Sequence, residues 1–450
     1  MKQAAKLGQQ LKNRKLAVSD DKIQKMGTDL EELACIHLTN RHPSELSPEE
    51  IEANTPKIEK MVIKRLRGTL PEQKSRAYTT QFDALTYFLA RFTPNFAIIY
   101  RLLWELKHLF PEFQPGHVLD FGSGTNSTFW ATETLWPSAA EEYICVDHSQ
   151  ALHDLSALLL RQGDLSNDPL RTGVYFKHFL PVSLSRCHNL VVAAHVLLDI
   201  PSKSQRRDLA LKLWDRCEDF LVLVELGTPA GFKTILEARD CILTAASVAN
   251  GDSLKESLTE FGVPHHVTEE LLAKPKRSQP LTLEECRNRL QNFADSSSSL
   301  STDQADRIRR LPVVALAEPG HVISPCPHDF TCPQFGRKTP CRFVARYFPL
   351  VLTDKQPGEP VHETYCYVIL RKGQRSEGHT DWSRIVLDDP VVKGKFVHCQ
   401  LCTPNGQVSQ MSLSRKSQPH LHKLAKKCSI GDRLPIKSLR ELSSTTESES

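Results

Sequence analysis

Three cysteines lie close together in a proline-rich stretch of the chain. The run VISPCPHDFTCPQFGRKTPCRF, Val322 to Phe343, holds Cys326, Cys332 and Cys341 with the spacing C-x5-C-x8-C. Its prolines argue against a helix or an interior strand, because proline has no backbone N–H to donate. Since proline-rich loops rarely use cysteines for packing, the pattern favours thiolates that bind a metal.

A fourth thiolate has to come from another segment, and the later run HCQLC provides Cys399 and Cys402. Four thiolates suit either a tetrahedral zinc ion or an iron–sulfur cluster. Zinc sites mostly use cysteines two to four residues apart, a spacing that the second pair has and the first three cysteines lack. Long, uneven gaps and neighbouring prolines are compatible with a larger cubane. The spacing alone leaves zinc and iron–sulfur open.

A second candidate site follows a predicted strand. HVLDFGSGTNSTFW places Asp120 at a strand end, then Gly122 and Gly124, then a helix. Glycines let the backbone turn tightly and approach a ligand. Asp147, at the end of the next predicted strand, lies at the sequence distance where a carboxylate meets ribose hydroxyls. An NAD-type loop is the competing interpretation, but Ser127 stands where its third glycine is required.

This loop resembles that of the class I S-adenosylmethionine-dependent methyltransferases. The family's D-x-G-x-G-x-G pattern is matched at Asp120, Gly122 and Gly124, whereas Asn126 replaces the last glycine. Asparagine tolerates positive φ better than other non-glycine residues, so the turn can form. The resemblance implies S-adenosylmethionine bound by the following residues: Asp120, Gly122, Ser123, Gly124, Asp147 and Glu225.

Residues for methyl transfer are harder to find. After the fourth predicted strand, VVAAHVLLDIPSK holds His195 and Asp199 but no Asn/Asp-Pro-Pro-aromatic motif, which in amino-methylating members clamps the base. A packed strand-end histidine is favoured over a catalytic base at His195. The sequence therefore predicts a cofactor site without catalytic residues.

Periodicity predicts an α/β fold with additions. Apolar runs alternate with helix-length segments from Val118, which is typical of a mostly parallel sheet covered on both faces. LPVVALAEPG and TYCYVILRKG are predicted as further strands, and the PNG turn predicts a C-terminal hairpin. The expected division begins with a basic, disordered or transit-like segment 1–27 and a helical region 28–112. A methyltransferase-like domain 113–372 follows, with a helical insertion at about 250–310 and a cysteine loop at 322–343. A small β module 373–438 and a disordered tail 439–450 complete the division.

Composition and charge narrow the partners. The 450 residues include 13 cysteines, most of which lie singly in segments where free thiols pack as small hydrophobes. No apolar run approaches the roughly 20 residues that span a bilayer, and no secretory signal is visible, so we expect no membrane partner. Basic tracts at Lys57–Arg76 and Arg415–Lys427 favour RNA, although a solvated helix face is the alternative for each.

The order of motifs closely resembles the methyltransferase-like protein 17 family, mitochondrial relatives of a yeast small-subunit ribosomal protein. LDFGSGTNSTFWA, YICVDHS, VELGTPAG, PCPHDFTCPQ and HCQLCTPNG carry the resemblance, which extends from about Leu30 to Pro435. It implies a monomeric factor of the mitochondrial matrix that helps to assemble the small ribosomal subunit. The implied partners are its rRNA, ribosomal proteins and other assembly factors. It also implies a [4Fe-4S] cluster and an S-adenosylmethionine-binding fold that has lost catalysis.

By the same resemblance, Cys326, Cys332 and Cys341 are expected ligands. Cys402 is favoured as the fourth, because the following TPNG turn suits an exposed thiolate, and Cys399 is the alternate. Two other functions stay open at this point: an active rRNA methyltransferase, and a zinc-stabilised interaction protein. The N-terminus, basic and without an acid before Asp20, is a poor match to a transit peptide.

Overall fold

The computed structural model describes most of the chain. The described residues are 2–14, 20–69, 78–181, 187–245, 247–248, 250–273, 281, 283–297, 300–315, 317–337, 339–350, 359–375 and 382–436. The predicted tail 439–450 lies outside them. Among the helices in these ranges, none combines the length and the apolar character that a membrane span needs.

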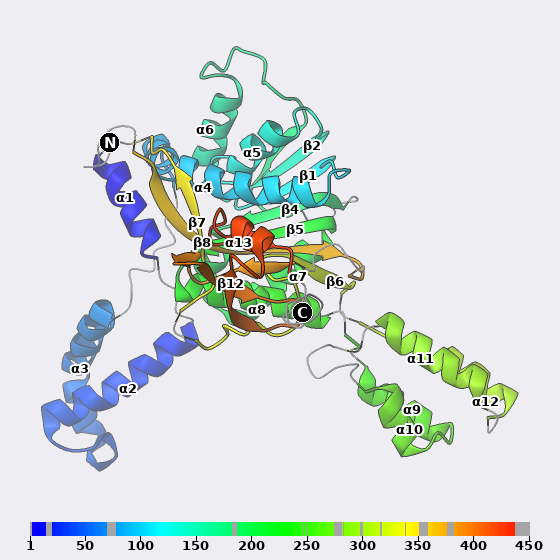
Figure 1. Cartoon of the computed structure of the whole chain (residues 1–450). Coiled ribbons are helices and arrows are strands. Elements are labelled where there is room, and N and C mark those ends of the chain that lie inside the picture. Colours follow the sequence, from blue (N-terminus) through cyan, green and yellow to red (C-terminus); the bar gives the residue numbers. More distant parts are fainter. Residues whose placement is uncertain are drawn as a thin grey trace.

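A mixed sheet forms the centre of the molecule (Figure 1). Its parallel strands follow the order β3-β2-β1-β4-β5, and the antiparallel β8 lies between β5 and β6. This order is that of the class I methyltransferase fold, so the predicted fold class is confirmed. The strands are β1 (His117–Phe121), β2 (Glu142–Val146), β3 (Val174–Lys177), β4 (His188–Ala194), β5 (Cys217–Leu226), β6 (Gly320–Ser324) and β8 (Val361–Lys372).

The strands are apolar on both sides because helices cover both faces of the sheet. One face buries side chains of α4 and α5, and the other buries side chains of α7 and α8. The helix α6 follows β2 and contacts α4. The bounds are α4 (Gln81–Leu109), α5 (Ser127–Leu135), α6 (Gln150–Leu160), α7 (Lys203–Asp215) and α8 (Pro229–Ala245).

The N-terminal helices divide into two groups. The long helix α4 shares the main core, and α1 (Lys2–Lys12) packs on α4. By contrast, α2 (Asp20–Thr39) and α3 (Pro48–Thr69) pack on each other around a small core of their own and are joined across the short η1 (Pro43–Glu45). Figure 1 shows this hairpin standing away from the sheet.

A second group of helices follows α8 and builds its own apolar core (Figure 1). These helices fall within the range where the sequence predicts an insertion. They are α9 (Gly251–Glu260), α10 (His265–Leu271), α11 (Leu283–Ser296) and α12 (Thr302–Arg309).

One predicted strand is wrong. Within LPVVALAEPG, the described residues form an isolated bridge from Ala315 to Val248, and the strand β6 begins only at Gly320. The prolines Pro312 and Pro319 explain the difference, because neither can donate a ladder hydrogen bond.

The cysteine loop leaves and rejoins one edge of the sheet. The strands β6 and β7 (Phe343–Tyr347) pair with different halves of β8, and residues 325–342 connect them. The loop therefore projects from a rigid edge.

The C-terminal residues form a small antiparallel sheet with one helix. The order is β10-β11-β9-β13, with β12 on β11, and the predicted PNG hairpin is the β11–β12 turn. We call residues 382–436 the C-terminal module. Its elements are β9 (Ser383–Ile385), β10 (Val391–Lys393), β11 (Phe396–Cys402), β12 (Val408–Ser414), α13 (Pro419–Ala425) and β13 (Arg433–Leu434).

Candidate metal centre and glycine-loop site

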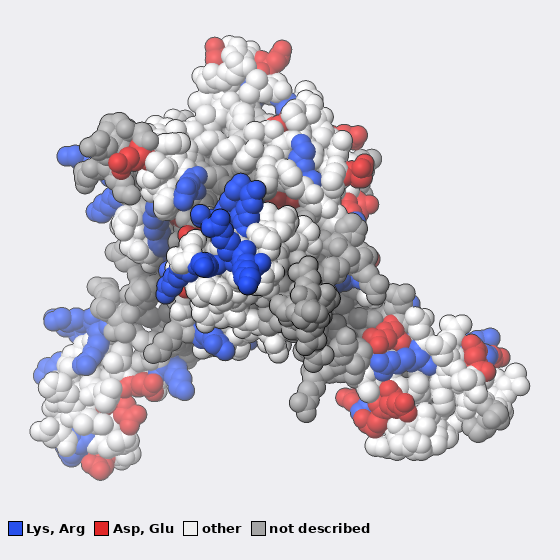
Figure 2. Space-filling model, in the orientation of Figure 1, with Lys and Arg blue, Asp and Glu red and all other residues white. Residues whose placement is uncertain are grey.

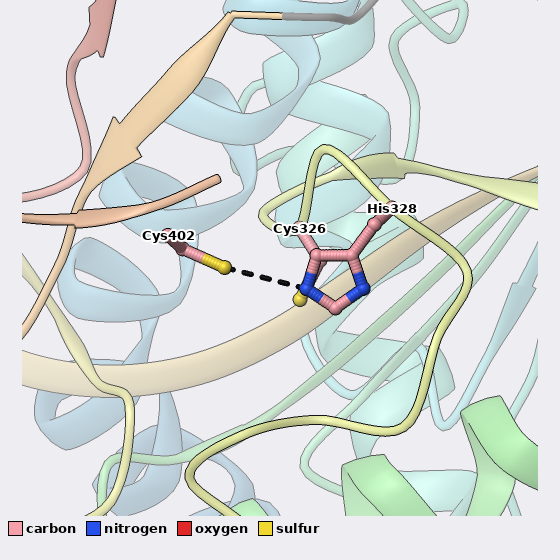
Figure 3. Close-up of side chains that lie close together, drawn as sticks. All are labelled: Cys326, His328 and Cys402. Atoms are coloured by element: carbon pink, nitrogen blue, oxygen red, sulfur yellow. Dashed lines mark hydrogen bonds between the residues drawn. The ribbon is translucent and has the colours of Figure 1, made fainter. Parts of the chain in front are cut away.

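The cysteine loop and the C-terminal module meet at three side chains. The ligand atoms of Cys326, His328 and Cys402 all lie within 4.8 Å of one another. Figure 3 shows His328 and Cys326 on the loop facing Cys402 on the module, and 3.4 Å separates Cys402 Sγ from His328 Nε2. His328 is a candidate ligand that the cysteine spacing did not predict, although its position two residues after Cys326 is a signal that could have found it.

Cys332 and Cys341, the other two predicted ligands, interact electrostatically with Cys326. Burial first, and then the charge of Cys326, raises the pKa of Cys332 to about 12. Burial raises the pKa of Cys341 as well, with contributions from Cys326 and Cys332. The pKa of Cys402 is raised, first by the hydrogen bond with Cys326 and then by burial and the charges of the other thiols. The structure thus brings Cys326 and Cys402 together with His328, whereas Cys332 and Cys341 lie outside this group, and all four cysteines are free thiols.

The strand β11 separates Cys399 from Cys402. Three residues apart on a strand, they point to opposite faces. Cys399 packs in the apolar core of the module beside the thiol of Cys428, whereas Cys402 faces the cysteine loop. This arrangement supports Cys402 as the fourth ligand.

Two buried arginines flank the thiols. Arg239 donates to the carbonyls of His328 at 3.2 Å and Phe330 at 2.8 Å. Arg384 donates to the carbonyl of Pro325 at 2.5 Å. The hydrogen bond from Cys402 lowers the pKa of Cys326 to about 7 despite burial, and both guanidinium groups add to this effect.

The loop is fixed next to the thiols by an acid. Asp329 accepts from the backbone N–H of Val322 at 2.7 Å and from Arg375 at 2.8 and 2.9 Å. Burial alone would raise the pKa of Asp329, but Arg375 and the Val322 N–H lower it below its ordinary value. The carboxylate is therefore charged and holds the loop.

These donors fit a thiolate-bound metal. The pKa values of Cys332, Cys341 and Cys402 are raised, so these thiols do not ionise together with Cys326 without a cation, and soft thiolates select zinc or iron–sulfur centres. His328 Nδ1 is buried with no hydrogen-bond partner, and burial lowers the pKa of His328 to about 4, so its ring is neutral at pH 7. A neutral imidazole beside thiols is a possible zinc ligand as well.

The glycine loop lies at the carboxyl ends of β1 and β2. Asp147 accepts from the backbone N–H of Gly124 through Oδ2 and from that of Ser149 through Oδ1, each at 3.0 Å. Gly122, Gly124 and Asn126 all have positive φ, of 74°, 53° and 58°. Asn126 thus adopts the backbone conformation that the sequence required of it.

Several polar atoms of the loop have no protein partner. Asp120 Oδ2, Ser123 Oγ and both amide atoms of Asn126 are buried without a hydrogen bond. Burial raises the pKa of Asp120 to about 7, with Thr128 lowering it and Asp147 raising it. Since buried polar groups nearly always have partners, these atoms are what a polar ligand would satisfy.

Two side chains cover the glycines closely. A Cβ added at Gly122 would lie 2.4 Å from Val196 Cγ2, and one added at Gly124 would lie 3.2 Å from Tyr87 Cε1. Tyr87 comes from α4 and Val196 follows β4, so neither contact was visible in the sequence. Both glycines are required by this contact as well as by their φ angles.

The remaining predicted residues lie at the ends of β4 and β5. Glu225 is fully buried, and its carboxylate accepts from the N–H groups of Leu198 at 3.0 Å and Leu226 at 3.3 Å. Burial raises its pKa to about 7. His195 Nδ1 is 4.0 Å from Glu225, and burial lowers the pKa of His195. Both side chains are therefore packed at the strand ends, Glu225 within β5 and His195 between β4 and η2 (Leu197–Asp199).

The chain matches solved structures at low similarity. A putative RNA methyltransferase from Pyrococcus horikoshii is 11% identical, covering 61% of this chain and 81% of its own, with a TM-score of 0.28. Magnesium protoporphyrin IX methyltransferase from Synechocystis PCC 6803 is 10% identical, covering 62% and 81%, with a TM-score of 0.26. The fold therefore rests on the strand order above.

Sequence comparisons are more specific. Residues 81–251 and 305–435 match the family model described as mitochondrial small ribosomal subunit Rsm22. The match begins with α4, and its gap covers most of the helical insertion. The human protein named ribosome assembly protein METTL17, mitochondrial, is 32% identical over 383 residues, which are 84% of this chain and 68% of the human protein. Since both matches extend over most of the chain, it belongs to the Rsm22 family and is a relative of the human METTL17.

Proposed function

We propose that this chain is an assembly factor of the mitochondrial small ribosomal subunit that binds rRNA through its C-terminal module and carries a [4Fe-4S] cluster. The cluster ligands would be Cys326, Cys332, Cys341 and Cys402. Its place is the mitochondrial matrix, where it acts as a monomer with rRNA, ribosomal proteins and other assembly factors. The role of the human relative, as its name states it, supports the assembly function.

The observation that carries the proposal is that the C-terminal module both meets the cysteine loop through Cys402 and carries a basic surface. Figure 2 shows Lys and Arg side chains gathered over α13. We call this the α13 basic surface, and it comprises the exposed residues Arg415, Lys416, Lys423, Lys426 and Lys427. Leu421, Leu424 and Ala425 face the module core and fix the helix beneath it. A metal at Cys402 would thus hold the RNA-binding element in place.

The basic tract at Lys57–Arg76 gives weaker support for RNA binding. Its described residues Lys57, Lys60, Lys64 and Arg65 lie on the exposed side of α3, while Ile58 and Val62 face the hairpin core. The spacing is that of a solvated helix face. Lys74 and Arg76 of the same tract lie outside the described residues.

The glycine-loop site is proposed to bind S-adenosylmethionine without methyl transfer. The unpartnered atoms of Asp120, Ser123 and Asn126 support a bound polar ligand. When bound, this cofactor supplies an electrophilic methyl group. His195 and Glu225 are enclosed at the strand ends rather than aimed at a substrate, which supports a cofactor that stabilises the fold.

RNA binding is tested with two triple variants of equal charge. Lys423, Lys426 and Lys427 are changed to Ala in one; Lys255, Arg307 and Arg310, on the helical insertion, are changed in the other. The first should weaken binding to small-subunit rRNA at least tenfold and reduce the salt slope by about 3, because roughly one counterion is released per phosphate contact. The second should bind as wild type does. Equal losses in both variants would show that the α13 basic surface is not the RNA site.

A zinc-stabilised interaction protein is the second candidate, because His328 lies within 4.8 Å of Cys326 and Cys402. His328→Ala distinguishes the four-cysteine cluster from a zinc site. A four-cysteine cluster does not need the imidazole, so the variant should keep its iron. A Cys/His zinc site would lose its metal in the same variant.

A further inference from the structure

The N-terminal segment lies against the end of the sheet where the glycine loop is. Figure 1 shows α1 beside α4 and β7. Ala4 and Leu7 are buried in this contact, and Gly8 lies beside Ala90 of α4, where an added Cβ would be 3.8 Å from that of Ala90. The helix is therefore packed onto the body of the protein.

The end of α1 is fastened by a buried acid. Lys12 Nζ lies 2.9 Å from Glu363, which is 3% exposed, and donates to the hydroxyl of Tyr347 at 3.3 Å. Glu363 also accepts from Arg91 at 2.8 Å. Because Arg91 would still pair with Glu363, the loss of Lys12 leaves no buried charge alone.

Arg14 then reaches the carboxyl ends of β4 and β5. Its guanidinium donates to the carbonyl of His195 at 3.4 Å and forms an ion pair with Asp199. Its charge also acts on the carboxyl of Glu225 and on the ring of Tyr87, which covers Gly124. The guanidinium thus lies among the residues that surround the glycine loop.

The position that Arg14 fills has a geometric meaning. In a parallel sheet, ligands bind beyond the carboxyl ends of the strands. The glycine loop follows β1, and β4 is the neighbour of β1. A group that accepts a methyl group from a ligand on this loop would have to lie over the ends of β4 and β5. A protonated guanidinium there has no free lone pair to accept a methyl group.

We propose that residues Lys2–Arg14 are a plug, with the Arg14 guanidinium filling the acceptor position, and that ligand exchange at the glycine loop requires the plug to lift. The inference rests on the proposed cofactor site. The acceptor position takes a guanidinium or similar cation because it presents the Asp199 carboxylate and the His195 carbonyl. The Asp199 side chain is 45% exposed, so this contact is weak enough to open.

The first test needs no ligand. Amide hydrogen exchange is measured on the full chain as wild type, Arg14→Ala and Lys6→Ala, where Lys6 is exposed on the same helix. Arg14→Ala should speed exchange in α1 and at the N–H of Leu198, which bonds Glu225, by about tenfold, with Lys6→Ala unchanged. Wild-type α1 amides that exchange as fast as an unfolded peptide would overturn the plug.

The second test measures release of S-adenosylhomocysteine. Release should be about tenfold faster from Arg14→Ala and from Lys12→Ala than from wild type or Lys6→Ala, because a closed site slows dissociation. Equal release rates in all four proteins would overturn the inference. If none of them binds S-adenosylhomocysteine, the cofactor proposal fails instead. The exchange data then decide alone whether Lys2–Arg14 closes the site.

Discussion

At the residue scale, the thiols show how far sequence spacing can lead. The spacing predicts a thiol-rich site from Cys326, Cys332 and Cys341 because proline-rich loops rarely use cysteines for packing. It cannot choose between Cys399 and Cys402, since the choice depends on which face of β11 meets the loop. Tyr87 and Val196 reach their sites through tertiary contacts. Their roles therefore become visible only in the folded chain.

The two cysteines of β11 give the first prediction. Cys402→Ser should lose bound metal, because its thiol faces Cys326, whereas Cys399→Ser should keep it, because its thiol packs inside the module. Metal per chain is measured by mass spectrometry after anaerobic purification. Equal metal loss in both variants would contradict this assignment of the fourth ligand.

The second prediction concerns pH. Burial raises the pKa of Asp120 to about 7, so between about pH 4 and 7 the folded protein binds a proton that the unfolded chain has released. Stability therefore falls as pH rises through this window and then levels off. Asp120→Asn should remove this part of the fall.

The size of the effect follows from the shift. Above pH 7, the free energy of unfolding of Asp120→Asn should exceed that of wild type by about 1–4 kcal/mol. Near pH 4 the two free energies should be equal. Urea unfolding at both pH values measures it, with exposed Asp208→Asn as the control. A pH-independent difference would show that ionisation of Asp120 is not the cause.

At the element scale, patterns of apolar residues predict the sheet well. Runs such as VLDF and YICV are buried strands because helices cover both faces. LPVVALAEPG has a similar composition, but its prolines prevent pairing, and pairing begins at Gly320. The part of α4 in the sheet core could not be predicted, because its amphipathic pattern does not name the surface that it covers.

The glycine loop gives an element-scale prediction. Gly122→Ala should cost about 1–2 kcal/mol for its positive φ and about 1–3 kcal/mol more for overlap with Val196. Gly163→Ala is the matched control, since Gly163 has φ of 86° and nothing within 4 Å of an added Cβ, so it should cost the first part alone. Chemical denaturation measures both. If Val196→Ala failed to relieve part of the Gly122→Ala cost, the close contact would be disproved.

At the scale of the whole molecule, the C-terminal module is held to the sheet body by two kinds of contact. One is the proposed metal centre. The other is Arg384, which donates to Glu105 of α4 at 2.5 Å and to the carbonyl of Gly431 at 2.6 Å. Burial alone would raise the pKa of Glu105, but Arg384 overrides it and lowers the pKa, so the pair is charged. The module is thus anchored to α4 as well as to the cysteine loop.

This anchor gives a prediction about the module. Arg384→Met should cost about 3–5 kcal/mol, because Glu105 would remain buried without its main partner. The exposed pair Arg307–Asp303 provides the control, as Arg307→Met should cost less than about 1 kcal/mol. Limited proteolysis should cut the module faster in Arg384→Met and leave residues of the sheet intact. Equal cleavage of the module in both variants would refute the anchor.

The metal content of the full chain tests the central proposal most directly. Protein purified without oxygen is assayed for iron, acid-labile sulfide and zinc. Four cysteine ligands around a cubane predict about four irons and about four sulfides per chain, which Cys402→Ser should lose. One zinc per chain, with no iron or sulfide, would contradict the account.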